Sequence, residues 1–454
     1  MDVQECANRC DGGCCEMCSK ALIIGGAGNM GQWFARTLKR QDYAVSIADI
    51  DPQAQEVASE LGIGFVKDED VPKAVVDFDI VLISVPINVT EEVISKVAPH
   101  MRPGSLLMDV TSVKKGPMKA MRKAPKGVEI IGTHPMFGPT MSEPLGQTVI
   151  LVAVEGRCEN WLPKIVALFE DEGAHVEFLS AEEHDQMMAV VQGLTHFAYI
   201  AVGATMDALE FDLNKSRRFM SPVYEVMVDF VGRILAQNPH LYAMIQASPD
   251  VKKVHDAFIT QCLELSKSAE FGETEKFVRL MRNAASHFGD TESALRRSDK
   301  LVNAKITELE TLANSIGEER GLRHIYSGVV HVGIVRKVTH QEVLLEKGGK
   351  RTELKIENVS LLSADELLQW KMDNLVHHRR DISVALSESV KPDIIAGILG
   401  GVDGVISVDQ IDTYGIKKGH VSLTYRITIR GDKDPNEVQH KVEELLKGIG
   451  GEIR

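Results

Sequence analysis

The sequence predicts a chain of four parts: an α/β domain, an all-α domain, a small β-rich segment and an α+β module. Three observations predict this organisation. Short apolar runs alternate with helical stretches up to about residue 180, long helical runs poor in Gly and Pro follow, and strand-like alternation returns near residue 325. A length of 454 residues, of which 44% are hydrophobic and 26% charged, is enough for several globular domains.

The first part, residues 20–180, has the pattern of a parallel sheet with helices on both faces. Ala21 to Ile24 is a short apolar strand that ends in glycines. Apolar and polar residues alternate at helical spacing over residues 32–40, and residues 43–48 form a second strand. Further strands are expected at residues 80–85, 105–108 and 128–131, and the last strand at residues 149–152. This alternation is typical of a doubly wound, Rossmann-type domain.

The second part, residues 181–320, is expected to be entirely helical. Helical runs are expected over residues 181–210, 223–236, 251–271 and 273–312. These runs are too apolar to form a solvated array, so we expect the domain to bury one face against a second copy of the chain. The prediction is an all-α dimerisation domain and a homodimer.

Two smaller parts follow. Residues 321–372 form a β-rich segment with strands at 329–338, 342–346 and 352–356, and a capping box at Ser363 opens a short helix through Trp370. Residues 381–454 then contain a strand, a helix, two strands, a helix and a terminal strand. That order predicts a ferredoxin-like α+β module.

Composition limits the compartment and the partners. The net charge of −14 disfavours a general nucleic-acid or anionic-membrane binder. No apolar run approaches the ~20 residues of a membrane helix, and the N-terminus lacks the features of a secretory signal, so we expect a cytoplasmic protein. Residues 1–19 are expected to be a loose Cys-rich extension, with metal ligation by its thiolates as the alternative. These cysteines are Cys6, Cys10, Cys14, Cys15 and Cys18.

A glycine motif marks a dinucleotide site. Gly26, Gly28 and Gly31 stand in the spacing GxGxxG between a predicted strand and a predicted helix. We expect Gly26 to permit the tight turn and Gly28 to let the backbone approach a pyrophosphate. Gly31 is expected to let the helix pack closely against the sheet. Asp49 lies at the end of the second strand, where its carboxylate would accept a hydrogen bond from the ribose 2′-hydroxyl and repel a 2′-phosphate. The expected cofactor is therefore NAD rather than NADP. The remaining residues of the predicted cofactor site are Asn29, Met30, Ser84 and Pro86.

A histidine follows another strand of the same sheet. His134 lies in the sequence Thr-His-Pro-Met-Phe-Gly-Pro, near the sheet edge where such folds bind ligands. A histidine there can accept the proton of a substrate hydroxyl while a hydride leaves the same carbon. Ser112, after the preceding strand, is expected to support it by a hydrogen bond. The structural alternative is a histidine that merely stabilises its loop.

The helical part adds candidates of its own. His184 and His196 are 12 residues apart, and Arg233 interrupts an otherwise apolar helical face. An arginine in such a place needs an anion, so it is either a clamp for a substrate carboxylate or one half of a buried ion pair. The sequence leaves both alternatives open.

Taken in order, these motifs resemble the prephenate dehydrogenase family from Gly25 to about Gly289. The resemblance implies NAD-dependent oxidative decarboxylation of prephenate to 4-hydroxyphenylpyruvate, a step of tyrosine biosynthesis. His134 matches the family's base, Ser112 the hydroxyl that orients it, Arg233 the clamp on the ring carboxylate and His196 a residue of the shared pocket. The motifs are Gly-Gly-Ala-Gly-Asn-Met-Gly, Ser-Val-Pro-Ile, Thr-Ser-Val-Lys, His-Pro-Met-Phe-Gly-Pro, Glu-His-Asp-Gln, Leu-Thr-His-Phe, Ser-Pro-Val-Tyr and Gly-Arg.

The last 74 residues resemble the ferredoxin-fold anticodon-binding domain of phenylalanyl-tRNA synthetase β chains, through the stretch from His420 to Arg430. From Asp381 to Arg454 there are 9 Lys and Arg against 12 Asp and Glu, a net charge of −3, whereas an RNA-binding surface should be basic. We therefore expect the module to sense an aromatic amino acid, tyrosine or phenylalanine, or to hold subunits together.

Two alternatives to the favoured function remain. Arogenate carries an amine in place of the keto group of prephenate, and the clamp and the base contact parts that both substrates share. A different class would be a tRNA-binding or aromatic-ligand-binding protein whose Rossmann domain only senses NAD. Ser112, His134 and Arg233 together argue against that class, because a sensor needs no base.

Overall fold

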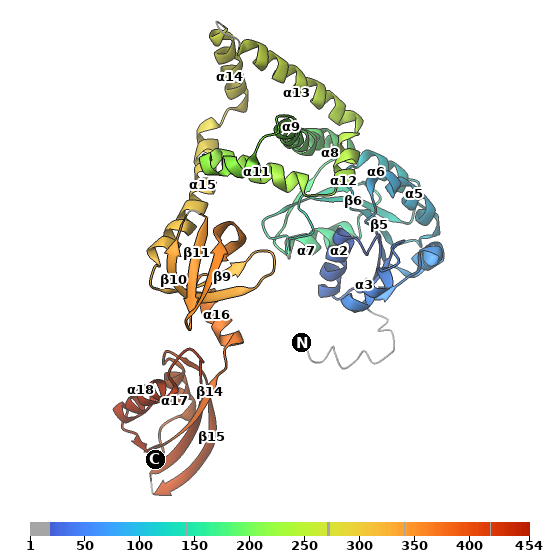
Figure 1. Cartoon of the computed structure of the whole chain (residues 1–454). Helices are drawn as coiled ribbons and strands as arrows, with labels where there is room; N and C mark the ends of the chain where they lie inside the picture. The colour runs from blue at the N-terminus through green and yellow to red at the C-terminus, as the bar shows by residue number, and fades with distance from the viewer. Residues whose placement is uncertain (1–18, 142, 270–272, 340, 418) are drawn as a thin grey trace. The chain divides into compact units, whose positions relative to one another are not determined.

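The computed structural model describes residues 19–454 except residues 142, 270–272, 340 and 418. It divides into two compact units, Met1–Gly289 and Asp290–Arg454 (Figure 1). The five cysteines of the predicted N-terminal extension lie outside the described residues.

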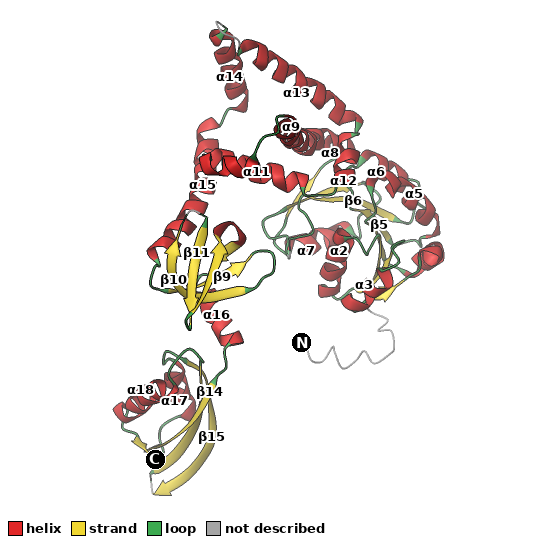
Figure 2. Cartoon of the chain, viewed as in Figure 1, coloured by secondary structure: helices red, strands yellow, loops and turns green. Residues whose placement is uncertain are grey.

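An eight-stranded sheet of order β3-β2-β1-β4-β5-β6-β7-β8 forms the centre of the first unit. Its strands are β1 (Lys20–Ile24), β2 (Ala44–Ala48), β3 (Gly64–Phe65), β4 (Ile80–Ile83), β5 (Leu106–Asp109), β6 (Glu129–Pro135), β7 (Thr148–Ala153) and β8 (His175–Phe178). The accompanying helices are α2 (Asn29–Arg40), α3 (Ala54–Leu61), α4 (Val71–Ala74), α5 (Ile87–Val97), α6 (Lys115–Met121) and α7 (Leu162–Glu170), which Figure 2 shows in red around the yellow strands.

Both faces of this sheet are buried, as the continuous apolar runs predict. Ala21 and Ile23 of β1 belong to one apolar core, and Leu22 and Ile24 belong to the other, because successive strand residues point to opposite faces. Strands β3, β2, β1, β4, β5 and β6 are parallel neighbours. The doubly wound Rossmann fold is confirmed.

The edge beyond β6 differs from the prediction. Residues 149–152 were expected to form the last strand, but β8 lies beyond β7. Strand β7 also runs antiparallel to β6, and β8 is parallel to β7. The segment between β6 and β7 contains no helix among its described residues, and an antiparallel pair needs no crossover helix.

The rest of the first unit is helical. It contains α8 (Ala181–Met188), a π-helical run (Ala189–Leu194), α9 (Thr195–Ala208), α10 (Leu213–Ser216), α11 (Pro222–Leu235), α12 (Pro239–Gln246), α13 (Pro249–Ser268) and α14 (Thr274–Phe288). The predicted run 273–312 is broken at Gly289, which has a left-handed φ of 78°.

The stretch Ala181–Ala208 is one continuous helical run of 28 residues, and its most apolar window has a mean hydropathy of 1.4. It is long and apolar enough to cross a membrane, contrary to our expectation that no run approaches that length. Within this chain only 17% of the window is buried. A helix that pairs with another subunit has the same length and composition, so these two properties alone do not assign it to a membrane.

The second unit begins with α15 (Thr291–Asn314), which the sequence had assigned to the helical domain. A five-stranded antiparallel sheet of order β12-β11-β10-β9-β13 follows. Its small core includes Leu322, Val335 and Val343, together with Leu312 of α15. The strands are β9 (Glu319–His324), β10 (Val330–Val338), β11 (Glu342–Lys347), β12 (Lys350–Lys355) and β13 (Val359–Leu361). The capping box of Ser363 and Glu366 then opens α16 (Ala364–Asn374), as predicted.

The C-terminal module has the predicted order of elements. They are β14 (His378–Ser387), α17 (Pro392–Gly400), β15 (Val405–Lys417), β16 (His420–Ile429), α18 (Pro435–Gly448) and β17 (Glu452–Ile453). The sheet order β15-β16-β14-β17, with a core of its own that includes Tyr425 and Leu399, is that of a ferredoxin-like fold.

An ion cluster joins the module to the β-rich segment. The Lys371 ammonium of α16 pairs with Glu319 of β9 and, at 2.9 Å, with Asp432 after β16. Arg430 Nε donates to Asp432 at 2.5 Å. Burial would raise the pKa of Asp432, but the bonds from Arg430 and Lys371 outweigh it and lower that pKa to about 2.

Candidate active site

The turn between β1 and α2 is shaped by its glycines. Gly25 has a φ of 82°, so the left-handed residue of the turn is Gly25, which precedes the Gly26 that was expected to permit the turn. A Cβ on Gly26 would lie 2.4 Å from Ile47, and one on Gly31 would lie 2.4 Å from the Gly25 carbonyl oxygen. Gly26 and Gly31 therefore serve close packing of the turn, the helix and the sheet.

Gly28 leaves the approach to the helix open. It is the N-cap of α2, and a Cβ there would meet nothing closer than 3.4 Å. No side chain caps this helix end, whose first residues are Asn29 and Met30. An open helix N-terminus that backbone N–H groups line is suited to a pyrophosphate.

The other predicted cofactor residues lie around this turn. Asp49 follows β2, and its carboxylate accepts hydrogen bonds from the Ala27 N–H at 2.9 Å and the Asp51 N–H at 3.1 Å. Ser84 follows the neighbouring strand β4, and Pro86 is the N-cap of α5. These residues fit the ribose and pyrophosphate of NAD, at the carboxyl ends of strands β1, β2 and β4.

His134 lies within β6 and is only 3% exposed. Its Nδ1 lies 2.8 Å from Nε2 of His184, and its Nε2 lies 3.1 Å from the amide nitrogen of Gln192. Among the described residues no hydrogen bond joins Ser112 to His134, and the role of Ser112 stays a prediction. His184 is the partner of Nδ1.

Asp185 continues the contact from His134 and His184. Its Oδ1 accepts from Nδ1 of His184 at 2.7 Å and from the Lys114 backbone N–H at 2.7 Å. Its Oδ2 accepts from the Lys115 backbone N–H at 3.0 Å. The result is a hydrogen-bonded chain Asp185–His184–His134 that runs from α8 to β6.

Burial keeps both imidazoles neutral. Burial is the main cause that holds the pKa of His134 well below 6.5, and the neighbouring His184 and Lys114 add to it. Burial also lowers the pKa of His184, against the opposing hydrogen bond to Asp185. For Asp185, burial would raise the pKa, but hydrogen bonds from His184, Lys115 and Lys114 lower it on balance. At neutral pH the chain therefore consists of one carboxylate and two neutral rings.

A buried ion pair lies beside this chain. Lys114 Nζ contacts Asp109 at 2.5 Å, and both side chains are fully buried. Asp109 ends β5 and also accepts from the Thr111 hydroxyl at 2.5 Å. Burial lowers the pKa of Lys114, and the attraction of Asp109 opposes that shift. Lys114 lies near His134, and its positive charge disfavours protonation of the ring.

His196 and Arg233 lie on the helical side of the site. The ring of His196 packs edge-on against Tyr242 of α12, with centroids 4.5 Å apart. Burial raises the pKa of Tyr242 and the charge of nearby Arg233 opposes it, so Arg233 lies close to this pair of rings. Arg233 is exposed, and no ion pair of its guanidinium is found among the described residues.

Two buried polar atoms on the helical side of the site, Nδ1 of His196 and Oε1 of Gln192, lack a hydrogen-bond partner among the described residues. On the strand side, Oδ1 of Asp109 and Oγ1 of Thr133 also lack one. Buried polar atoms are nearly always paired, so orphaned atoms beside a buried base are suited to a polar ligand. No sequence motif singled out Gln192 or Tyr242.

The π-helical run explains how three polar side chains share one face. Residues eight apart, such as His184 and Gln192, would lie roughly 80° apart on an α-helix, because each residue turns the chain by about 100°. One π turn of about 4.4 residues plus one α turn of about 3.6 residues makes eight, so both side chains can reach His134. His196, four residues further on, remains near that face.

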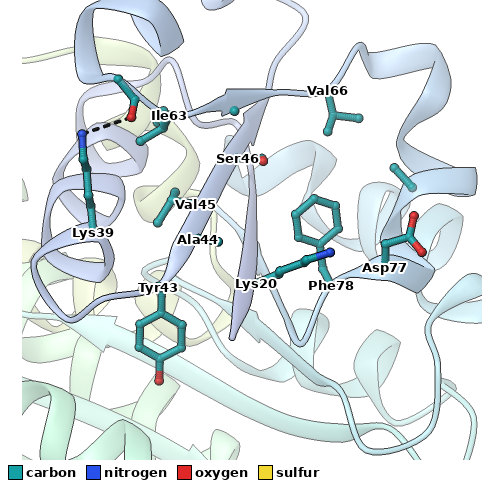
Figure 3. Close-up of a pocket in the computed structure, with 13 residues that line it drawn as sticks. Lys20, Lys39, Tyr43, Ala44, Val45, Ser46, Ile63, Val66, Asp77 and Phe78 are labelled. Atoms are coloured by element: carbon teal, nitrogen blue, oxygen red, sulfur yellow. Dashed lines mark hydrogen bonds between the residues drawn. The ribbon is translucent and has the colours of Figure 1, made fainter. Parts of the chain in front are cut away.

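A separate depression of about 690 Å³ lies at the opposite, amino-terminal ends of β1 and β2 (Figure 3). Lys20, Lys39, Tyr43 and Phe78 are among its lining residues. Lys39 already donates to the Leu61 carbonyl at 2.7 Å and to the Gly62 carbonyl at 3.1 Å, and the second of these bonds is the dashed line in Figure 3. Because it lies away from the carboxyl ends of the strands, this depression does not belong to the site described above.

Comparison with known proteins agrees with this geometry. The chain matches the model "Prephenate dehydrogenase, nucleotide-binding domain" over residues 34–178 and "Prephenate dehydrogenase, dimerization domain" over residues 180–283. A "Probable arogenate/prephenate dehydrogenase" of Methanocaldococcus jannaschii is 39% identical over 437 residues, which cover 95% of this chain and 98% of that protein. The match therefore extends through the second unit.

More distant similarities cover about three fifths of the chain. The "T-protein" of Enterobacter agglomerans is 32% identical over 287 residues, which are 61% of this chain and 69% of that protein. The crystal structure of prephenate dehydrogenase from A. aeolicus with hydroxyphenyl propionate and NAD+ has a TM-score of 0.49 at 24% identity, over 59% of this chain and 96% of that one.

Proposed function

We propose, on the premise that this chain belongs to the prephenate dehydrogenase family, that it oxidises prephenate to 4-hydroxyphenylpyruvate with loss of CO₂ and with NAD as cofactor. The observation that carries the proposal is the buried, neutral imidazole of His134 at the carboxyl end of β6, with its Nε2 directed to the amide of Gln192. When bound, NAD supplies the hydride acceptor.

His134 is the proposed base. Its Nε2 accepts the proton of the C4 hydroxyl as the hydrogen on C4 departs as a hydride, and C4 becomes a carbonyl. The C1 carboxylate then leaves as CO₂, and its bonding electrons aromatise the ring. His134 returns the proton to the C4 oxygen, so the histidine ends the turnover neutral, as it began. The loss of CO₂ drives the reaction, and the protein mainly positions the reacting groups.

Arg233 and His196 are the proposed substrate contacts. The exposed Arg233 guanidinium, free of an internal carboxylate partner among the described residues, is suited to a substrate carboxylate. The buried, unpaired Nδ1 of half-buried His196 can hydrogen-bond a polar group of the same ligand. We propose Ser112, after β5, as a contact to the ligand and not as the partner of His134.

The helical domain is proposed to form a homodimer in the cytoplasm. Phe219, Val223, Met281 and Phe288 are more than 60% exposed, and the family model that covers this region describes a dimerization domain. Contiguous apolar patches on a protein surface often mark an interface with another protein. Sedimentation equilibrium should give twice the chain mass, and a monomer at micromolar concentration would contradict the proposal.

Steady-state NADH production tests the reaction. We expect turnover with prephenate and NAD, with 4-hydroxyphenylpyruvate and CO₂ as products in equal amounts. Arogenate, measured beside prephenate, decides the substrate: a higher kcat/KM for arogenate would make the chain an arogenate dehydrogenase with the same base. Binding of NAD without turnover of either substrate would contradict catalysis altogether.

The C-terminal module is proposed to sense tyrosine or phenylalanine, and not to bind nucleic acid. Its net charge of −3 is unsuited to phosphates. A chain that ends after Leu375 keeps α16, whereas a cut at Trp370 would fall inside that helix. We expect the shortened chain to stay active and to lose any inhibition by tyrosine that acts outside the catalytic pocket. Identical inhibition curves for both chains would contradict sensing by the module.

A further inference from the structure

Three side chains from two elements form a continuous chain of hydrogen bonds. Asp185 Oδ1 lies 2.7 Å from His184 Nδ1, and His184 Nε2 lies 2.8 Å from His134 Nδ1. His184 is fully buried and His134 is 3% exposed, so water does not compete for these bonds. Each ring nitrogen of the two histidines has one polar neighbour within 3.1 Å.

The donors and acceptors in this chain have one consistent arrangement. Asp185 is a carboxylate that already accepts the Lys114 and Lys115 N–H groups, so it can only accept from His184. His184 must then carry its proton on Nδ1, which leaves Nε2 as an acceptor. His134 must donate from Nδ1, and its Nε2 is left with a lone pair.

The contacts of the Gln192 amide are consistent with this assignment of protons. Its amide nitrogen lies 3.1 Å from His134 Nε2 and can donate to the lone pair, while its own oxygen is buried without a partner. In the opposite arrangement His184 would direct a bare Nδ1 at the Asp185 carboxylate. Two acceptors 2.7 Å apart in a buried site would repel each other.

We propose that Asp185 and His184 are positioning residues that fix His134 in the Nδ1–H tautomer, so that Nε2 keeps the lone pair that accepts the substrate proton. The inference rests on the proposed role of His134 as the base. Asp185 also stabilises, through His184, the positive charge that His134 gains during turnover. Neither residue touches the reacting atoms.

The charges around His134 support this division of roles. Lys114, at the N-cap of α6, lies near the ring and opposes its protonation, and Asp109 of β5 neutralises that lysine. His184 of α8 is the titratable hydrogen-bond partner of the His134 ring among the described residues. Asp185, behind His184, is thus the anion connected to the base by hydrogen bonds.

Two substitutions of His184 distinguish its role in orienting the His134 ring from its role in packing. His184→Phe keeps a ring of similar size but removes the acceptor for His134 Nδ1–H, and we expect kcat to fall about 10²- to 10⁴-fold, the range for a base held in the wrong tautomer. KM for prephenate and for NAD should stay within about threefold. His184→Gln retains an acceptor oxygen at similar reach and should recover at least about tenfold of the lost kcat.

The tautomer itself can be observed. Nitrogen-15 NMR of histidine-labelled protein distinguishes Nδ1–H from Nε2–H, and the His134 signal is identified by its absence in His134→Asn. We expect Nδ1–H in the wild type and a mixture or Nε2–H in His184→Phe and in Asp185→Asn. A purely structural role would lower stability without a change of tautomer.

A matched control and a double variant complete the test. His175→Phe makes the same substitution at an exposed histidine of β8, which pairs with Glu177, and should leave kcat unchanged. In the His134→Asn background, His184→Phe should cause no further loss of kcat, because a positioning residue acts only through the base.

The outcomes are distinguishable. Loss of activity in His134→Asn together with kcat within threefold of wild type in His184→Phe would overturn this inference and leave the proposed base intact. Full activity of His134→Asn would overturn the proposed function instead. If His184→Phe does not fold, His184→Gln and Asp185→Asn decide the matter by the tautomer of His134: an unchanged Nδ1–H signal in Asp185→Asn overturns the inference.

Discussion

Burial gives His134 the protonation state that a base requires at neutral pH. The ring is neutral because burial, His184 and Lys114 hold its pKa well below 6.5. A base with a lowered pKa stays active as the pH falls through 6.5, and activity is lost only below that point. We expect His134→Asn to lower kcat by roughly a hundredfold or more and to leave KM for NAD nearly unchanged. A variant within threefold of wild type in kcat would exclude the role.

Arg233 offers its charge to a ligand without giving up an internal ion pair among the described residues. Arg233→Gln should therefore raise KM for the dicarboxylate by about 1.5 to 3 kcal/mol, the value of a lost charged hydrogen bond. That corresponds to roughly a 10- to 150-fold rise in KM. Arg296→Gln, at an exposed arginine that pairs with Glu292, serves as the control. Loss of thermal stability with KM unchanged would assign Arg233 a structural role.

Asp49 sets the choice of cofactor in this proposal. Its carboxylate is held by the Ala27 and Asp51 N–H groups beside the glycine turn, where a 2′-phosphate would meet a like charge. Asp49→Ser should narrow the preference for NAD over NADP in kcat/KM. Equal use of the two cofactors by the wild-type protein would contradict the assignment.

At the scale of elements, the connection from β5 to α6 depends on one buried charge pair. Asp109→Asn would leave the fully buried Lys114 ammonium without its counter-charge, and we expect a loss of about 3 to 5 kcal/mol in the free energy of unfolding. The measurement is urea-induced unfolding. The double variant Asp109→Leu with Lys114→Met removes both charges and should recover most of this loss. A loss below about 1 kcal/mol in Asp109→Asn would show that water reaches the lysine.

The elements that sequence analysis predicted correctly are those in which apolar residues recur regularly along the sequence. The strands of the Rossmann sheet and the C-terminal module have it, whereas β8 is four residues long and has no buried residue. Strand β9 begins with Glu319 and Arg320, and β13 is three residues long, so neither has a recognisable apolar run. Strands of this kind form because a neighbouring strand provides the hydrogen bonds.

The site was predicted in part for a related reason. Residues at strand ends, such as His134 and Asp49, follow from the topology of the sheet. The contact between His184 and His134 depends on two elements that are 50 residues apart in the sequence, and no local pattern predicts it. Gln192 was missed because its spacing from His184 fits no α-helical face.

At the scale of the whole second unit, the cluster around Lys371 ties the C-terminal module to the β-rich segment. The pKa of Asp432 is lowered to about 2, so its contribution to stability is fully present above the unfolded value of about 3.9 and is lost as the pH falls from about 4 to about 2. We expect the linker between α16 and β14 to become sensitive to pepsin over that range. In Asp432→Asn the sensitivity should already be present at pH 4. Equal cleavage of wild type and variant at pH 4 would show that the cluster does not hold the module in place.

The π-helical run has a consequence for the comparison of sequences in this family. A π turn accommodates one residue more than an α turn, and the helix on either side keeps its direction and phase. Relatives with an uninterrupted α-helix should therefore carry one residue fewer between the positions equivalent to His184 and Gln192. An alignment of this helix needs a one-residue gap within Ala189–Leu194, and without that gap it would match His196 with a residue on the wrong side of the helix.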